Sequence, residues 1–157
     1  MRVNVLGVCE TKMIGAGSIK EGSYTITGSG GDQRKNGVAI IADESATKCI
    51  LGTWCISDRV MLAKIKGKHF NTNIIQVYAP TAQCDESDIE NFYEDLERAR
   101  AQCKSQEVVI VMGEMHAKVG EGRDENIVGD YGLGEGNERG EKFINWCKTH
   151  NQMIANT

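Results

Sequence analysis

The feature that most constrains the fold is a short apolar run, Val108–Met112, which stops abruptly at Gly113. A run of this length, polar on one side and closed by glycine on the other, predicts a strand buried on both faces. A carboxylate, Glu114, and an imidazole, His116, follow directly. Proteins of the α/β type build sites in loops at strand ends, so this stretch predicts a candidate site. A loop whose polar side chains simply face water is the alternative interpretation.

The same arrangement occurs near the N-terminus, where Glu10 follows a strand predicted over Val3–Val8. A glycine- and serine-containing loop is predicted up to Gly22, and a turn over 28–32. Alternating or β-branched stretches predict further strands, and the last of them starts near the C-terminus. These further strands are expected at 24–27, 37–42, 49–56, 60–66, 73–78 and 152–156.

Two amphipathic helices are predicted. Asp85 caps the first, in which apolar residues recur at the three-and-four spacing of one buried stripe. Asn137 caps the second, whose Phe143, Ile144 and Cys147 are expected to face inward. Strands in runs with few helices predict an α/β (α+β) fold with stacked mixed sheets, in a single domain over residues 1–157.

Composition limits the classes of function. The chain has 157 residues and a formal charge of −4, which argues against a protein that depends only on contacts with a nucleic-acid backbone. That charge is compatible with a metal-dependent nuclease, in which carboxylates gather around a divalent ion. Lys64, Lys66 and Lys68 alternate along a predicted strand, and we interpret them as a solvated sheet face, with a nucleic-acid track as the alternative.

The six cysteines form no C-x-x-C pair and show no zinc-site spacing, which favours reduced thiols. The N-terminus reads as a strand and not as a signal peptide, and no apolar run approaches the roughly 20 residues of a membrane span. We therefore expect a nuclear or cytoplasmic protein that is neither secreted nor membrane-bound.

Five sequence blocks occur in an order typical of a known family. Together they resemble the endonuclease/exonuclease/phosphatase superfamily, and within it the apurinic-endonuclease-like domain of non-LTR retrotransposons of the RTE/BovB type. The blocks are Leu6–Lys12, Asn36–Ile41, Asp58–Arg59, Ile75–Thr81 and Gly113–Gly120.

The resemblance implies a four-layer sandwich of two packed mixed β-sheets flanked by helices, with a Mg²⁺-dependent phosphodiesterase site for DNA at the sheet ends. By position, Glu10 matches the metal-binding glutamate and Tyr78 the tyrosine that contacts the scissile phosphate. Arg59 lies near the substrate face and is a candidate for binding phosphate. Glu114 and His116 stand where the family has an aspartate that orients water and an asparagine that holds the phosphate.

The departures from the family pattern predict an impaired site. Glu114 is one methylene longer than aspartate, and His116 replaces a fixed amide donor by a titratable ring. A metal-binding asparagine and a closing Asp-His pair would lie before Met1 and after Thr157. The resemblance therefore implies a domain truncated at both ends, with weak or absent binding of Mg²⁺ or Mn²⁺.

We expect a retrotransposon-derived, Mg²⁺-dependent DNA endonuclease-like domain with little or no activity. Two alternatives stay open. The chain is an active DNA endonuclease, or it is a non-enzymatic interaction module or inert remnant with an unidentified protein partner.

Overall fold

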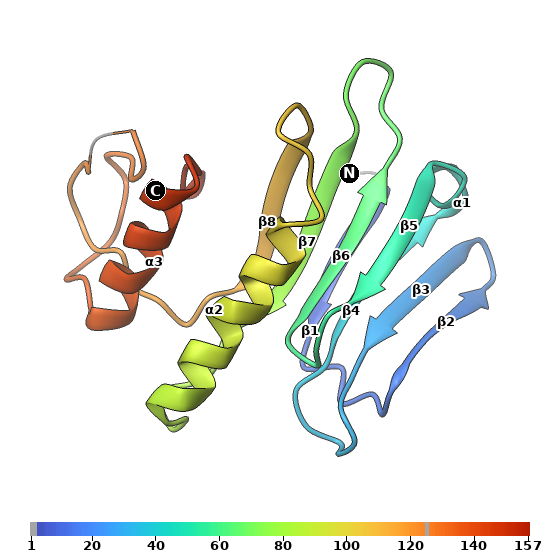
Figure 1. Ribbon diagram of the computed structural model, residues 1–157, viewed down its shortest axis with the longest axis horizontal. Coiled ribbons are helices and arrows are strands. Elements are labelled where there is room, and N and C mark those ends of the chain that lie inside the picture. Colours follow the sequence, from blue (N-terminus) through green and yellow to red (C-terminus); the bar gives the residue numbers. More distant parts are fainter. Residues whose placement is uncertain (1–2, 125) are drawn as a thin grey trace. The chain divides into compact units, whose positions relative to one another are not determined.

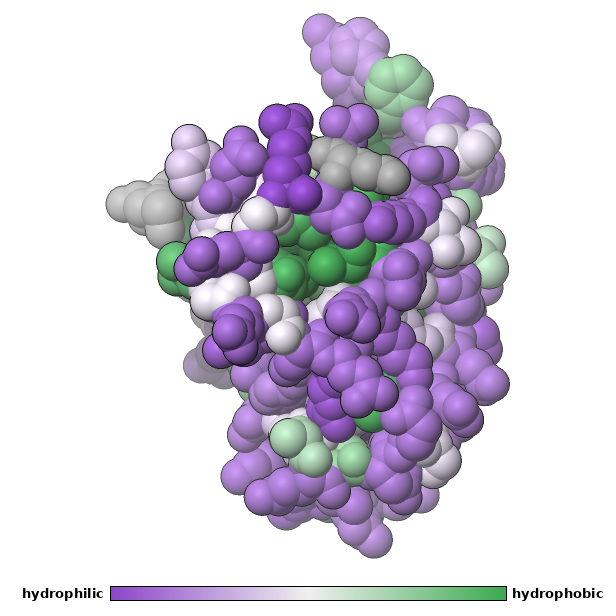
Figure 2. All heavy atoms as spheres, turned by 90° about the vertical axis from the view of Figure 1, so that its left-hand side faces the viewer, coloured by the Kyte–Doolittle hydropathy of each residue, from purple (hydrophilic) through white to green (hydrophobic). Residues whose placement is uncertain are grey.

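The structure is a computed structural model that describes residues 3–124 and 126–157. It divides the chain into two compact units, residues 1–114 and 115–157. Among the described residues, no helix has the length and apolar character needed to cross a membrane. Most residues on the face shown in Figure 2 are hydrophilic.

The first unit contains two four-stranded sheets (Figure 1). The first sheet has the order β1-β4-β3-β2 and is antiparallel throughout. Its strands are β1 (Val5–Cys9), β2 (Ala16–Glu21), β3 (Tyr24–Ser29) and β4 (Val38–Asp43). The second sheet has the order β5-β6-β7-β8 and is mixed, because β7 and β8 run parallel. Its strands are β5 (Ile50–Cys55), β6 (Val60–Ile65), β7 (Thr72–Tyr78) and β8 (Val108–Glu114).

Three helices complete the fold. The short α1 (Glu44–Thr47) follows β4, and α2 (Glu86–Arg100) supplies the crossover between β7 and the parallel β8. In the second unit, α3 (Glu138–Thr149) is capped by Asn137, whose Oδ1 accepts from the backbone N–H of Gly140 at 2.8 Å. The predicted caps of both long helices are confirmed, since Asp85 Oδ1 accepts from the N–H of Asp88 at 3.0 Å.

An apolar layer fills the space between the two sheets. It is built from alternate residues of β4, β6 and β7, because successive side chains of a strand point to opposite faces. Its buried members are Val38, Ile40, Met61, Ala63, Ile74 and Tyr78. Helix α2 packs against β6, and its buried side chains include Ile89, Phe92 and Leu96. The predicted sandwich of two packed sheets is therefore confirmed, with only the second sheet mixed.

The prediction that Val108–Met112 is buried on both faces is wrong. Strand β8 is an edge strand paired within its sheet only to β7, and Val108 and Ile110 are 48% and 45% exposed. The prediction of a loop up to Gly22 is also wrong, since β2 occupies most of it and pairs with β3. No strand is found at 152–156 in the described part of the chain, where Ile154 makes an isolated bridge to Val128. In α3, Cys147 is buried as predicted, whereas Phe143 and Ile144 are half-buried.

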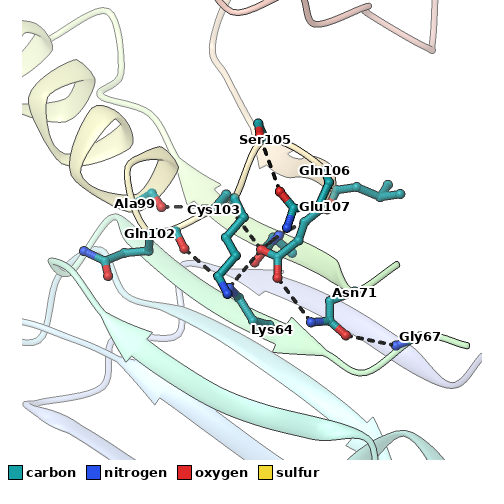
Figure 3. A network of polar contacts seen from close by, with 12 residues as sticks. Lys64, Gly67, Asn71, Ala99, Gln102, Cys103, Ser105, Gln106 and Glu107 are labelled. Atoms are coloured by element: carbon teal, nitrogen blue, oxygen red, sulfur yellow. Dashed lines mark hydrogen bonds and ion pairs between the residues drawn. The ribbon is translucent and has the colours of Figure 1, made fainter. Parts of the chain in front are cut away.

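The lysine row does not form a solvated sheet face. Strand β6 ends at Ile65, and Lys64 Nζ lies 2.9 Å from Glu107 Oε2 in an ion pair whose side chains are only 14% and 5% exposed. Glu107 also accepts from Asn71 Nδ2 at 3.2 Å (Figure 3). A second amide, Asn73 Nδ2, donates to Glu107 at 3.0 Å. This network ties the connection between α2 and β8 to the far end of β7.

We predict that Lys64→Met destabilises the fold more than Lys48→Met does, as measured by urea unfolding. Lys48 forms an ion pair of similar length with Glu44, at 2.8 Å, but both side chains are largely exposed and water screens them. Removing Lys64 instead leaves the Glu107 carboxylate buried without its cation. Equal losses of stability for the two variants would contradict this role for the network.

The same network gives a pH dependence. Hydrogen bonds from Lys64 and from the backbone of Lys104, together with Asn73, hold the pKa of Glu107 well below its ordinary value. Because the pKa of Glu107 is lower in the folded state, its ionised carboxylate stabilises the fold above about pH 4.3, the pKa of a glutamate in the unfolded chain. This contribution is lost as the pH falls from that value towards the folded-state pKa. We expect the stability of the wild type to fall more steeply than that of Glu107→Gln between about pH 4 and pH 2.

Candidate active site at one rim of the sandwich

Backbone hydrogen bonds join three loop segments at one rim of the first unit. The N–H of Thr11 donates to Gly37 O at 3.1 Å, and that of Lys12 donates to Asn36 O at 2.9 Å. The N–H of Gly37 donates in turn to Asp58 O at 2.9 Å. The segment after β1, the start of β4 and the loop before β6 therefore lie side by side.

Two more strand ends join the same rim. The N–H of Tyr78 donates to Arg59 O at 2.9 Å, and the N–H of Ala79 donates to Glu114 O at 2.8 Å. Tyr78 and Glu114 are also partners in the parallel pairing of β7 with β8. The structure thus gathers four of the predicted site residues, which are far apart in sequence: Glu10, Arg59, Tyr78 and Glu114.

The rim contains unusual backbone conformations. Glu10, Lys12 and Asn36 have φ values of 54°, 54° and 55°, in the left-handed region that non-glycine residues rarely adopt. Such residues persist only where surrounding contacts hold them, and they concentrate at functional sites. Here the contacts are the hydrogen bonds between the segment after β1 and residues 36–37.

Tyr78 and Glu10 form the central pair of the site. Tyr78 is 5% exposed, and its hydroxyl donates to Glu10 Oε1 at 2.8 Å. Burial raises the pKa of the Tyr78 phenol to about 12, with further contributions from the Glu10 hydrogen bond and from the charges of Glu10 and Glu114. The phenol therefore stays protonated at neutral pH, so Tyr78 serves as a hydrogen-bond donor and not as a base.

Arg59 contacts this pair from the loop directly before β6. Its Nη1 donates to Tyr78 O at 3.2 Å, and its guanidinium lies 5.5 Å from the centroid of the Tyr78 ring. A cation over a tyrosine ring is attracted by the ring quadrupole. Arg59 therefore lies at the rim, and its contacts with Tyr78 hold the phenol in place.

The donor set of the rim suits a hard divalent cation. Glu10 and Glu114 supply carboxylate oxygens, and both charges act on the same phenol. Among the residues that the structure describes, no group of three or more His, Cys, Asp or Glu is placed to hold a metal. Mg²⁺ keeps several waters and needs only one or two carboxylates, so the site fits Mg²⁺ or Mn²⁺ in kind, with few protein ligands.

His116 belongs to the second unit and has a left-handed backbone, with φ of 46°. Its contribution to the rim remains a prediction from chain order. No role was predicted for Asn36 and Asp58, yet Asn36 Nδ2 donates a hydrogen bond to Asp58 Oδ2 at 2.8 Å. The Asn36-Gly37 dipeptide was the available signal, since both residues accept positive φ values.

No family model matches the chain. Sequence comparison finds craniofacial development protein 2 of Tragulus javanicus and of Bos taurus, each 34% identical over 158 aligned positions. The alignments cover the whole of this chain but only 28% and 27% of those proteins. The chain is homologous to a part of craniofacial development protein 2 and spans little more than a quarter of its length.

We predict that Glu10→Gln lowers the pKa of Tyr78. The substitution removes a negative charge that disfavours ionisation of the phenol and weakens the acceptor of its hydrogen bond. The measurement is a pH titration of ¹³Cζ-labelled tyrosine by NMR, with Tyr78→Phe identifying the signal. An unchanged midpoint would contradict the pairing.

Proposed function

Taking the homology to craniofacial development protein 2 as the premise, we propose that this chain forms the metal- and phosphate-binding part of a DNA endonuclease-like domain of the retrotransposon type. The observation that carries the proposal is the hydrogen bond between Tyr78 and Glu10 at a rim that also includes Glu114 and Arg59. It joins a carboxylate suited to a hard cation with a neutral donor suited to a phosphate oxygen.

The residues of the rim have different proposed roles, which follow from their chemical groups. Glu10 would hold the cation through a carboxylate oxygen, and Glu114 would orient the attacking water. A bound Mg²⁺ or Mn²⁺ would polarise a phosphoryl oxygen and stabilise the leaving oxygen. Tyr78 donates a hydrogen bond without adding negative charge near the phosphate, and Arg59 fixes its position.

Hydrolysis is proposed to be slow because of Glu114 and His116. The extra methylene of Glu114, relative to aspartate, displaces the carboxylate by roughly a bond length, and a misplacement of about 1 Å can cost on the order of 100-fold in rate. A neutral imidazole at residue 116 offers one donor, where the family pattern has an amide with two.

The loop between β3 and β4 supports DNA as the partner. Arg34 and Lys35 are exposed in this loop, and the exposed Lys12 is hydrogen-bonded through its backbone to the end of the same loop. Within the described residues, none of these three cations takes part in an ion pair. Unpaired cations beside a phosphodiester site attract the phosphates that flank the reacting bond.

We predict slow nicking of supercoiled plasmid in Mg²⁺ or Mn²⁺, which Glu10→Ala abolishes because the first carboxylate ligand is lost. Glu114→Asp restores the family's shorter carboxylate and is expected to raise the rate by about 10- to 100-fold. The metal dependence is checked by adding EDTA. Nicking that persists in Glu10→Ala would contradict the proposed site. An unchanged rate in Glu114→Asp would show that Glu114 is not the cause of slow turnover.

We further predict that Arg34→Gln/Lys35→Gln weakens binding of a DNA duplex and lowers the slope of log affinity against log salt by about two. The matched control is Lys66→Gln/Lys68→Gln, which removes the same charge from the loop between β6 and β7 and is expected to leave the slope unchanged. Fluorescence anisotropy in EDTA measures both. Equal effects of the two pairs would contradict binding along the first loop.

A further inference from the structure

Gln76 is a polar residue inside the apolar layer between the sheets. It lies on the same face of β7 as Ile74 and Tyr78, which belong to the apolar core, and it is only 1% exposed. Neither the proposed metal site nor the predicted phosphate contacts give it a role. Its burial therefore requires a separate explanation.

The amide of Gln76 forms few hydrogen bonds for a buried group. Its Nε2 donates to Cys9 Sγ at 3.2 Å, and sulfur is a weak acceptor. Its Oε1 accepts no hydrogen bond from any residue that the structure describes. One weak hydrogen bond offsets little of the cost of burying an amide, so a contribution to stability does not explain Gln76.

Two glycines shape the space around this amide. A Cβ at Gly7 of β1 would overlap Gln76 Oε1, and a Cβ at Gly113 of β8 would lie 2.9 Å from Nε2. Gly7, in the sheet opposite β7, therefore leaves room for the glutamine, whereas a Cβ at Gly113 would first overlap the backbone oxygen of Val77. The fit is specific to a side chain that reaches from β7 across to β1.

Cys9 is the point where this side chain meets β1. The Cys9 thiol donates to Val77 O at 3.3 Å and accepts from Gln76 Nε2, so two successive residues of β7 hold it. Glu10, with its left-handed backbone, directly follows Cys9 at the end of β1, and Tyr78 directly follows Val77 in β7. Cys9 and Val77, which are in contact, are therefore the residues directly before Glu10 and Tyr78, which form the hydrogen bond.

We propose that Gln76 is a positioning residue that, through Cys9, sets the place of Glu10 against Tyr78. Its purpose, the orientation of a metal-binding carboxylate, rests on the proposed function, whereas the geometry does not. Residues that orient metal ligands from behind typically change metal affinity or activity by about 10- to 100-fold when they are removed.

Asn73 provides a matched control on the same strand. It too is fully buried and has a side-chain oxygen without a hydrogen-bond partner among the described residues. Its Nδ2, however, donates to Glu107 in the structural network at the other end of β7. The two amides thus differ in what they serve, and their substitutions separate stability from positioning.

The experiment compares Gln76→Met, Asn73→Leu and Glu10→Gln with the wild type. Urea unfolding measures stability, and the ¹³Cζ chemical shift of Tyr78 at pH 7 without metal reports the Tyr78–Glu10 hydrogen bond. We expect Gln76→Met to keep or raise the urea midpoint and to move the Tyr78 signal by at least half of the change in Glu10→Gln. We expect Asn73→Leu to lower the midpoint and leave the Tyr78 signal in place.

An unmoved Tyr78 signal in Gln76→Met overturns the proposal. If that variant unfolds, Cys9→Ala removes the sulfur that receives Nε2 and is expected to move the signal in the same direction, so that an unmoved signal there overturns the proposal instead. Calorimetry with Mn²⁺ tests whether this positioning serves metal binding. We expect Gln76→Met to bind Mn²⁺ about 10-fold more weakly than the wild type. A wild type that neither binds Mn²⁺ nor nicks DNA refutes the proposed function, while the Tyr78 signal still decides the positioning.

Discussion

The apolar layer between the two sheets is the constraint on which the rest of the structure depends. Val38 begins β4 and Tyr78 ends β7, and both belong to this layer. Burial of such side chains is favourable by about 1.5–3 kcal/mol each, and it also fixes the two sheets face to face. Since the rim consists of the ends of the strands that carry the layer, packing brings Glu10 within hydrogen-bond distance of Tyr78.

Strand β7 runs from the buried Glu107 network at its start to the Tyr78–Glu10 hydrogen bond at its end. At its start, Asn73 takes part in the buried network around Glu107, which anchors the crossover to β8. Along its inner face, Gln76 and Tyr78 direct polar groups towards β1 and Glu10. A strand buried on both faces holds these groups in fixed positions, which the proposed metal site would require.

Elements with strong local signals could be predicted from the sequence. Helix α2 and its cap at Asp85 were predicted correctly because capping and amphipathic spacing are properties of neighbouring residues. Strand β2 was missed because its exposed, glycine-containing sequence forms a strand only by pairing with β3. The burial of Val108 and Ile110 was overestimated because their position at a sheet edge is not encoded in the run itself.

The sequence by itself determined which chemical groups are available: the carboxylates of Glu10 and Glu114, the phenol of Tyr78 and the guanidinium of Arg59, each next to a strand end. Only the tertiary structure decided which of them meet. Tyr78 and Glu10 are 68 residues apart, and Lys64 and Glu107 are 43 apart. Such pairs form when sheet packing brings distant strands together, and no local pattern of residues specifies that packing, because it depends on the fit of the whole apolar layer.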